Sequence, residues 1–127
     1  MSAPTRRSEP TASRWKVWID FTRPFTLWPP ALGMVSGGVT AWGAAGANLH
    51  DDPTRLLFNV GIGALMAAVL NGASNAINQI YDLPLDAINK PRRPLPSGRM
   101  TIPEAKVVTA VLYAVALALA ALVNWMC

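Results

Sequence analysis

Three long stretches without a charged residue constrain this chain more than any other feature. No Asp, Glu, Lys or Arg occurs in residues 24–50, in residues 56–81, or from residue 107 to the end. Each stretch can form a membrane-spanning helix, which needs about 20 apolar residues. A soluble bundle would carry charges on the outer face of each helix. The sequence therefore predicts an all-α polytopic membrane bundle with three transmembrane helices, at about residues 24–47, 56–81 and 103–126.

The basic residues indicate how these helices are oriented. The formal charge is +4, which on its own would also suit a nucleic-acid partner. Ten of the basic residues, however, precede the first span or separate the second from the third: Arg6, Arg7, Arg14, Lys16, Arg23, Lys90, Arg92, Arg93, Arg99 and Lys106. Only Arg55 lies in the first loop. By the positive-inside rule we expect an integral, multi-pass protein of the cell or inner membrane, with a cytoplasmic N-terminus and second loop and no nucleic-acid partner.

Shorter signals divide the chain further. Residues 1–14 are rich in Ser, Thr, Pro and Arg, which predicts a disordered cytoplasmic tail before a membrane domain at 15–127. Residues 15–21 mix aromatic and charged side chains, as in a helix lying in the membrane interface. Pro24, Pro29 and Pro30 predict a turn or kink where the first span starts. Thr101 and Glu104 have the spacing of a capping box, which predicts the start of the third span.

Polar residues recur at helical spacing along the second span. Asn71, Asn75, Asn78 and Asp82 are four, three and four residues apart, and Asp86 would continue the row. Such offsets place side chains on one helix face. In a membrane helix a polar face is turned toward a protein cavity. Asn78, Asp82 and Asp86 offer oxygen ligands, which suit Mg²⁺ held together with substrate phosphates, and the basic residues that follow could hold further phosphate oxygens.

The same pattern has a plainer interpretation. Aspartates at a helix end are often only solvated, and cytoplasmic loops are basic in most membrane proteins. Pro84 also lacks a backbone donor and disfavours helical dihedral angles at Leu83. We therefore expect the helix to end near Asp82, in which case Asp86 lies on a turn rather than on the same face.

Three sequence segments resemble a known family. The row from Asn78 to Asp86 is followed by INKP at 88–91 and RPLPSGR at 93–99, and FTRP stands at 21–24. These segments are similar to the first Asp-rich motif, the loop after it and the Arg-Pro start of the first helix in UbiA-type intramembrane prenyltransferases. The wording is closest to the branches of chlorophyll synthase, homogentisate prenyltransferase and the archaeal lipid-ether synthases. The resemblance covers about residues 15–126.

The resemblance implies a bundle of about nine membrane helices, by fold-level analogy. It also implies an Mg²⁺-dependent enzyme that transfers a prenyl group from a polyprenyl diphosphate to an aromatic or other lipid-biosynthesis acceptor within the membrane. Asn78, Asp82 and Asp86 would bind the diphosphate through Mg²⁺. The residues that would contact the diphosphate directly are Lys90, Arg92, Arg93 and Arg23.

Two departures from the family pattern shape the expectation. Pro84 stands where the family more often has a charged or polar residue, and the chain ends before the family's second Asp-rich motif. We therefore expect the N-terminal part of a larger enzyme, inactive by itself, whose second motif a separate chain could supply. The alternative is a non-catalytic small membrane protein or a degenerate prenyltransferase remnant.

Overall fold

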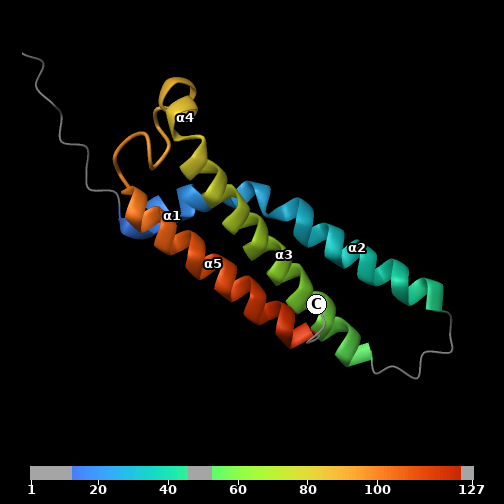
Figure 1. Ribbon diagram of the computed structural model, residues 1–127. Helices are drawn as coiled ribbons and strands as arrows, with labels where there is room; N and C mark the ends of the chain where they lie inside the picture. The colour runs from blue at the N-terminus through green and yellow to red at the C-terminus, as the bar shows by residue number, and fades with distance from the viewer. Residues whose placement is uncertain (1–12, 46–52, 124–127) are drawn as a thin grey trace, which may run out of the picture.

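The computed structural model describes residues 13–45 and 53–123, and all regular structure in these two ranges is helical. The elements in chain order are α1 (Arg14–Thr22), the 3-10 helix η1 (Pro24–Thr26), α2 (Trp28–Ala45), α3 (Pro53–Tyr81), α4 (Leu83–Asn89) and α5 (Ile102–Val123). Three long helices lie side by side, with α3 between α2 and α5 (Figure 1). The all-α prediction is confirmed for these residues. Most of the predicted tail, the first loop and the end of the third span lie outside them.

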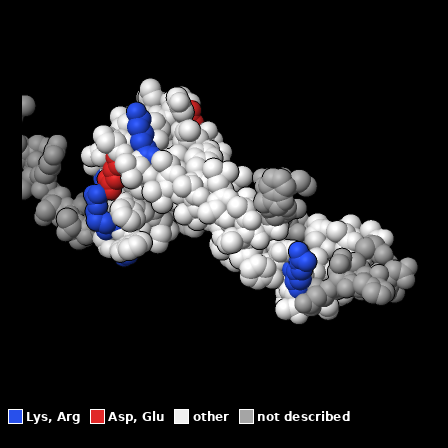
Figure 2. All heavy atoms as spheres, turned by 60° about the horizontal axis from the view of Figure 1, so that its bottom comes forward, with Lys and Arg blue, Asp and Glu red and all other residues white. Residues whose placement is uncertain are grey.

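Two of the three predicted spans are long and apolar enough to cross a membrane. Within the described ranges these are α3, of 29 residues, and α5, of 22 residues. α2 is also free of charge, but its two prolines, four glycines and two tryptophans lower its hydropathy. Charged side chains occupy the two ends of the face shown in Figure 2, with uncharged surface between them. This distribution is what a membrane-embedded middle requires.

A turn precedes α2, as the prolines predict. The predicted span starts at residue 24, but the α-helix begins only at Trp28, because the 3-10 helix η1 occupies Pro24–Thr26. Arg23 joins α1 to η1 with φ 55° and ψ 68°, in the left-handed region. Few residues with a side chain adopt this conformation. The turn is closed by the Thr26 amide, which donates to the Arg23 carbonyl at 2.9 Å.

The second span is interrupted close to Asp82, also as predicted. α3 ends at Tyr81, and α4 begins at Leu83 with Pro84 in its first turn, where a missing N–H is tolerated. The Asp86 amide donates to the Asp82 carbonyl at 2.8 Å, so helical hydrogen bonding resumes at once. The expectation that Asp86 lies on a turn is therefore wrong, since α4 carries it.

Glycines allow α2 and α3 to approach closely. A Cβ atom added to Gly38 would lie 2.4 Å from a methyl carbon of Val60, and one added to Gly63 would lie 2.7 Å from the Met34 methyl carbon. At both positions only a hydrogen fits without a shift of the neighbour. Gly38 of α2 and Gly63 of α3 therefore serve helix packing, as small residues commonly do between membrane helices.

The buried core lies at one end of the bundle, where α1, α4 and residues 90–101 gather (Figure 1). Its buried members are Val17, Phe21, Ala76, Leu95, Met100 and Ala105. At this end the Thr101 hydroxyl accepts the Glu104 amide at 3.4 Å, which is one half of the predicted capping box. The Glu104 carboxylate instead accepts from the Trp18 indole at 2.9 Å and pairs with Arg14. α1 is thereby attached to the start of α5.

Candidate functional site

A hollow of about 700 Å³ lies between the α1–η1 junction and the segment after α4. Its charged lining residues are Asp20, Arg23, Lys90, Arg92, Arg93 and Arg99. Five of these are cationic and one is anionic, so the hollow is strongly positive. Guanidinium and ammonium groups at this density suit a multiply charged anion such as a phosphate ester. The structure thus brings together, in one concave surface, all four cationic residues that the sequence resemblance names.

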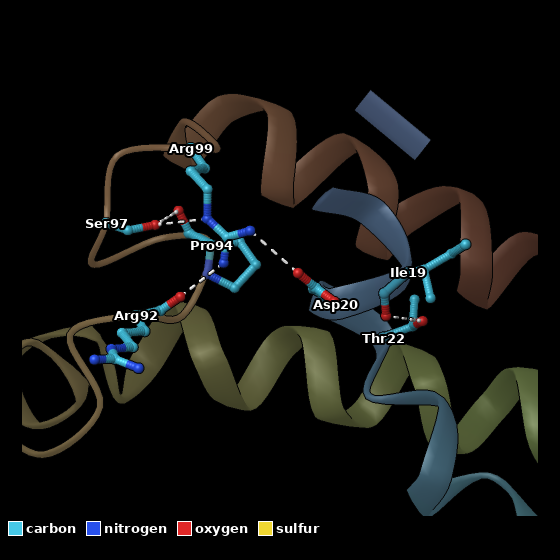
Figure 3. A network of polar contacts seen from close by, with 7 residues as sticks. All are labelled: Ile19, Asp20, Thr22, Arg92, Pro94, Ser97 and Arg99. Atoms are coloured by element: carbon cyan, nitrogen blue, oxygen red, sulfur yellow. Dashed lines mark hydrogen bonds and ion pairs between the residues drawn. The ribbon is translucent and has the colours of Figure 1, made fainter. Parts of the chain in front are cut away.

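Arg99 holds the wall of this hollow together (Figure 3). Its guanidinium donates to the Asp20 carboxylate at 3.1 Å and to the Arg92 carbonyl at 2.7 Å, and its Nε donates to the Ser97 hydroxyl at 3.1 Å. The bond to Asp20 attaches residues 90–99 to α1, and the other two bonds lie within that segment. Sequence reasoning missed Arg99 as a site residue, although it closes the RPLPSGR segment. Its role depends on Asp20, 79 positions earlier in the chain.

Asp86 is buried and paired with Arg93. The residue is 4% exposed, and one carboxylate oxygen accepts a hydrogen bond from the Arg93 guanidinium. A buried carboxylate needs such a partner, because an isolated charge is very costly away from water. The ion pair joins α4 to the wall of the hollow. It also means that Asp86 is already engaged in the described structure.

Asn78 and Asp82 are exposed, in contrast to Asp86. Within the part of the chain that the structure describes, the Asp82 carboxylate takes part in no hydrogen bond or ion pair. Across the same residues no three His, Cys, Asp or Glu side chains converge as a metal cluster would. An amide oxygen and a free carboxylate fit the preference of Mg²⁺ for oxygen ligands. Asp86 can serve as a ligand of Mg²⁺ only after its ion pair with Arg93 is broken.

Asn71 and Asn75, the first two residues of the polar row, have a different role from the predicted metal ligands. The Asn75 amide donates to the Thr26 hydroxyl at 2.7 Å and to the Asn71 side-chain oxygen at 2.9 Å. The Gln79 amide donates to the Phe21 carbonyl at 2.6 Å, and Gln79 is 3% exposed. These bonds connect α3 to the α1–η1 junction. The sequence did not predict a structural role for Gln79, because this residue is not part of the row of Asn and Asp residues at helical spacing.

Comparison with known proteins gives a consistent result. The profile of the UbiA prenyltransferase family matches residues 22–127. Chlorophyll synthase of Arabidopsis thaliana is 36% identical over 92 residues, which are 72% of this chain and 22% of that protein. Digeranylgeranylglyceryl phosphate synthase of Methanopyrus kandleri is 33% identical over 112 residues, 88% of this chain and 37% of that protein. The same synthase of Natronomonas pharaonis is 39% identical over 98 residues, 76% and 34% of the two chains.

The matches cover between 72% and 88% of this chain but a minor part of each relative. The chain spans between 22% and 37% of the length of these three proteins. No solved structure matches it. The family match includes Arg23, the polar row and the segment from Lys90 to Arg99 that lines the basic hollow. The chain therefore belongs to the UbiA prenyltransferase family, and with its two apolar helices it is an integral membrane protein.

Proposed function

We propose that this chain contributes the first diphosphate-binding part of an intramembrane prenyltransferase. The observation that carries the proposal is the basic hollow, in which Arg23 from the α1–η1 junction meets Lys90, Arg92 and Arg93 from the segment after α4. A diphosphate carries several negative charges, and a cluster of fixed cations at a membrane boundary is a suitable receptor for it. Because the chain belongs to a prenyltransferase family, we propose that this diphosphate is attached to a prenyl group.

The chemistry of this reaction assigns roles to the residues. The bond between the allylic carbon and the diphosphate oxygen breaks, and its electron pair stays on the diphosphate. Fixed cations in the hollow stabilise that growing negative charge more than they stabilise the ground state. The prenyl carbon then forms a bond to an electron-rich atom of the acceptor, and any hydrogen on that atom leaves as a proton. Water must be kept from the cationic prenyl group, and the apolar helices provide such surroundings.

Asn78 and Asp82 are the residues that would hold Mg²⁺, with Asp86 as a third ligand once it leaves Arg93. The metal would supply charge neutralisation for the diphosphate. A shift of Asp86 toward the metal would free the Arg93 guanidinium to donate to phosphate oxygens. In the absence of substrate, the ion pair would keep Asp86 and Arg93 from being buried as unpaired charges.

The proposal includes a topology. α2 is taken as a third span beside α3 and α5, in a larger bundle of about nine helices by fold-level analogy. Residues 15–127 form the N-terminal part of this domain, and the N-terminus and residues 90–101 face the cytoplasm, as the distribution of basic residues favours. The second Asp-rich motif lies in another part of the enzyme or in a separate chain.

The acceptor is proposed only as a class. One group of relatives is named for chlorophyll synthesis and another for digeranylgeranylglyceryl phosphate synthesis. Both names fit an aromatic or other lipid-biosynthesis acceptor that reaches the site from within the membrane. The donor, a polyprenyl diphosphate, is common to the proposal whichever acceptor is used.

The test is prenyl transfer by the complete enzyme that carries this chain, with labelled geranylgeranyl diphosphate and membranes that contain the acceptor. Asp82→Asn should abolish Mg²⁺-dependent transfer, since it removes a free carboxylate without removing a contact of the fold. Transfer at the wild-type rate by this variant would refute the metal role. The 127-residue chain alone should be inactive, and turnover by the purified chain would contradict the need for a second motif.

The ion pair between Asp86 and Arg93 favours one alternative function. A non-catalytic membrane protein or a prenyltransferase remnant could retain the Asp86–Arg93 pair solely to hold the fold. Such a protein would show no Mg²⁺-dependent binding of prenyl diphosphate, even when the missing part is supplied. The binding measurement therefore separates the two functions.

A further inference from the structure

The backbone of Arg23 is in a conformation that the residue itself disfavours. Its φ of 55° places a side-chain-bearing residue in the left-handed region, and Arg23 is the only non-glycine residue of the described ranges with positive φ. Such a conformation persists only where the surroundings hold it. The same residue lines the basic hollow. Specific side chains must therefore hold this backbone in place.

One set of bonds holds the carbonyl of Arg23 from the η1 side. The Thr26 hydroxyl donates to the Arg23 carbonyl at 2.8 Å, in addition to the bond from the Thr26 amide. That hydroxyl in turn accepts from the Asn75 amide at 2.7 Å. Asn75 is itself held by the Asn71 side chain on the preceding turn of α3. A chain of hydrogen bonds thus runs from the middle of α3 to the Arg23 backbone.

A second, independent bond holds the chain on the α1 side. The Gln79 amide donates to the Phe21 carbonyl at 2.6 Å, two residues before Arg23. Phe21 is fully buried, and Gln79 is 3% exposed. A hydrogen bond in such dry surroundings is costly to break, because the separated groups find no water. The left-handed residue is therefore restrained on both sides from α3, through Thr26 by Asn75 and through Phe21 by Gln79, one turn further along the helix.

We infer that Thr26, Asn75 and Gln79 form a clamp, called here the Arg23 clamp, whose function is to present the Arg23 guanidinium to the hollow. The inference rests on the proposed function of the hollow as a diphosphate site. The three residues are positioning residues: Thr26 and Gln79 bond the backbone at Arg23 and Phe21, and Asn75 holds the Thr26 hydroxyl. The clamp explains why an apolar membrane helix carries Asn75 and Gln79, which the proposed metal ligands alone do not explain.

The experiment uses the full 127-residue chain in lipid nanodiscs, with two measurements. The first is the pair of Cα and Cβ chemical shifts of Arg23 without ligand, which report whether φ is positive. The second is the affinity for inorganic diphosphate in the presence of Mg²⁺. The variants are Thr26→Val, which has the same shape but no hydroxyl, and Thr26→Ser, which restores the hydroxyl. The matched control is Thr40→Val, because the Thr40 hydroxyl donates to a backbone carbonyl on an exposed part of α2.

The clamp predicts that Thr26→Val abolishes the left-handed shifts and weakens diphosphate binding by about tenfold, the scale of one charge-assisted contact. Thr26→Ser and Thr40→Val should behave as the wild type. In an Arg23→Gln background Thr26→Val should weaken binding by less than about twofold, since its effect passes through Arg23. Gln79→Met should repeat these results from the other side of the turn, and it decides the matter if Thr26→Val does not fold.

Unchanged Arg23 shifts in folded Thr26→Val and Gln79→Met would overturn the clamp, whatever the diphosphate does. If Thr26→Val weakens diphosphate binding equally in the wild-type and Arg23→Gln backgrounds, the clamp is also overturned. The side chains of Thr26 and Gln79 would then act on the whole fold and not through Arg23. Absence of diphosphate binding by the wild type is a different result. It would refute the diphosphate site itself, and with it any role of the clamp in binding, even if the shifts confirm the turn.

Discussion

The ion pair between Asp86 and Arg93 leads to a prediction that separates the two aspartates of the motif. The Asp86 side chain is 6% exposed and that of Arg93 is 18% exposed. Removing one partner of a buried pair costs about 3–5 kcal/mol, and hydrogen bonds to charged groups contribute about 1.5–3 kcal/mol. Asp86→Asn keeps the shape and one acceptor, and Arg93 keeps some contact with water. We therefore expect Asp86→Asn to lower the free energy of unfolding by about 2–3 kcal/mol.

Asp82→Asn is the matched control. The Asp82 side chain is exposed and, among the described residues, has no hydrogen-bonding or ionic partner. Its replacement should change the free energy of unfolding by less than about 0.5 kcal/mol, as is usual for exposed positions. The assay is reversible unfolding of the chain in mixed micelles, with increasing sodium dodecyl sulfate and helicity followed by circular dichroism.

A double-mutant cycle with Arg93→Gln makes the test specific. If the pair forms as described, Asp86→Asn should cost at least about 1.5 kcal/mol less in the Arg93→Gln background than in the wild type. The same cycle with Asp82→Asn should show no coupling. Equal stability of Asp86→Asn and Asp82→Asn, or a coupling near zero for Asp86, would show that the buried pair does not exist in the membrane protein.

Two further predictions concern packing and the wall of the hollow. Gly38→Ala should lower the free energy of unfolding by about 1–3 kcal/mol, because the new methyl group meets Val60. Gly37→Ala, with open space around it, should be neutral or stabilising by up to about 1 kcal/mol. Equal effects of the two substitutions in the same micelle assay would contradict the close approach of α2 and α3. The exposed Arg99–Asp20 pair should contribute at most about 1 kcal/mol of coupling between Arg99→Gln and Asp20→Asn. Arg99→Gln should nevertheless speed proteolysis of residues 90–99, and unchanged proteolysis would show that Arg99 does not anchor this segment.

The sequence predicts the long helices and their breaks well, and the reason is local. Runs without charge mark α3 and α5, because every turn of a membrane helix must tolerate lipid. Pro24 and Pro84 lack a backbone donor, so the positions of η1 and of the break at Asp82 follow from single residues. The start of α2 at Trp28 and the continuation of the helix through Asp86 were not predicted. Pro84 stands in the first turn of α4, where its missing donor is tolerated, so helical bonding resumes with the Asp86 amide.

The site was predicted only as far as residue type and sequence neighbourhood allow. Lys90 and Arg92 follow the polar row directly, so their place near it could be predicted. The partner of Gln79 is a backbone carbonyl 58 positions away, and any residue type could supply it. The pairing of Asp86 with Arg93 depends on how residues 90–93 turn back toward α4. Helical periodicity alone placed Asp86 with Asn78 and Asp82, but burial separates it from them.

The central claim is that the basic hollow binds the diphosphate of a prenyl donor with Mg²⁺. The most direct measurement is the affinity of the chain in nanodiscs for geranylgeranyl thiodiphosphate, which resists ionisation, with Mg²⁺ or with a chelator. We expect Mg²⁺-dependent binding that Lys90→Gln and Arg92→Gln each weaken by about tenfold. Arg55→Gln, at the opposite end of α3, should leave the affinity unchanged. Absence of binding by the wild type, or an equal loss with Arg55→Gln, would contradict the account.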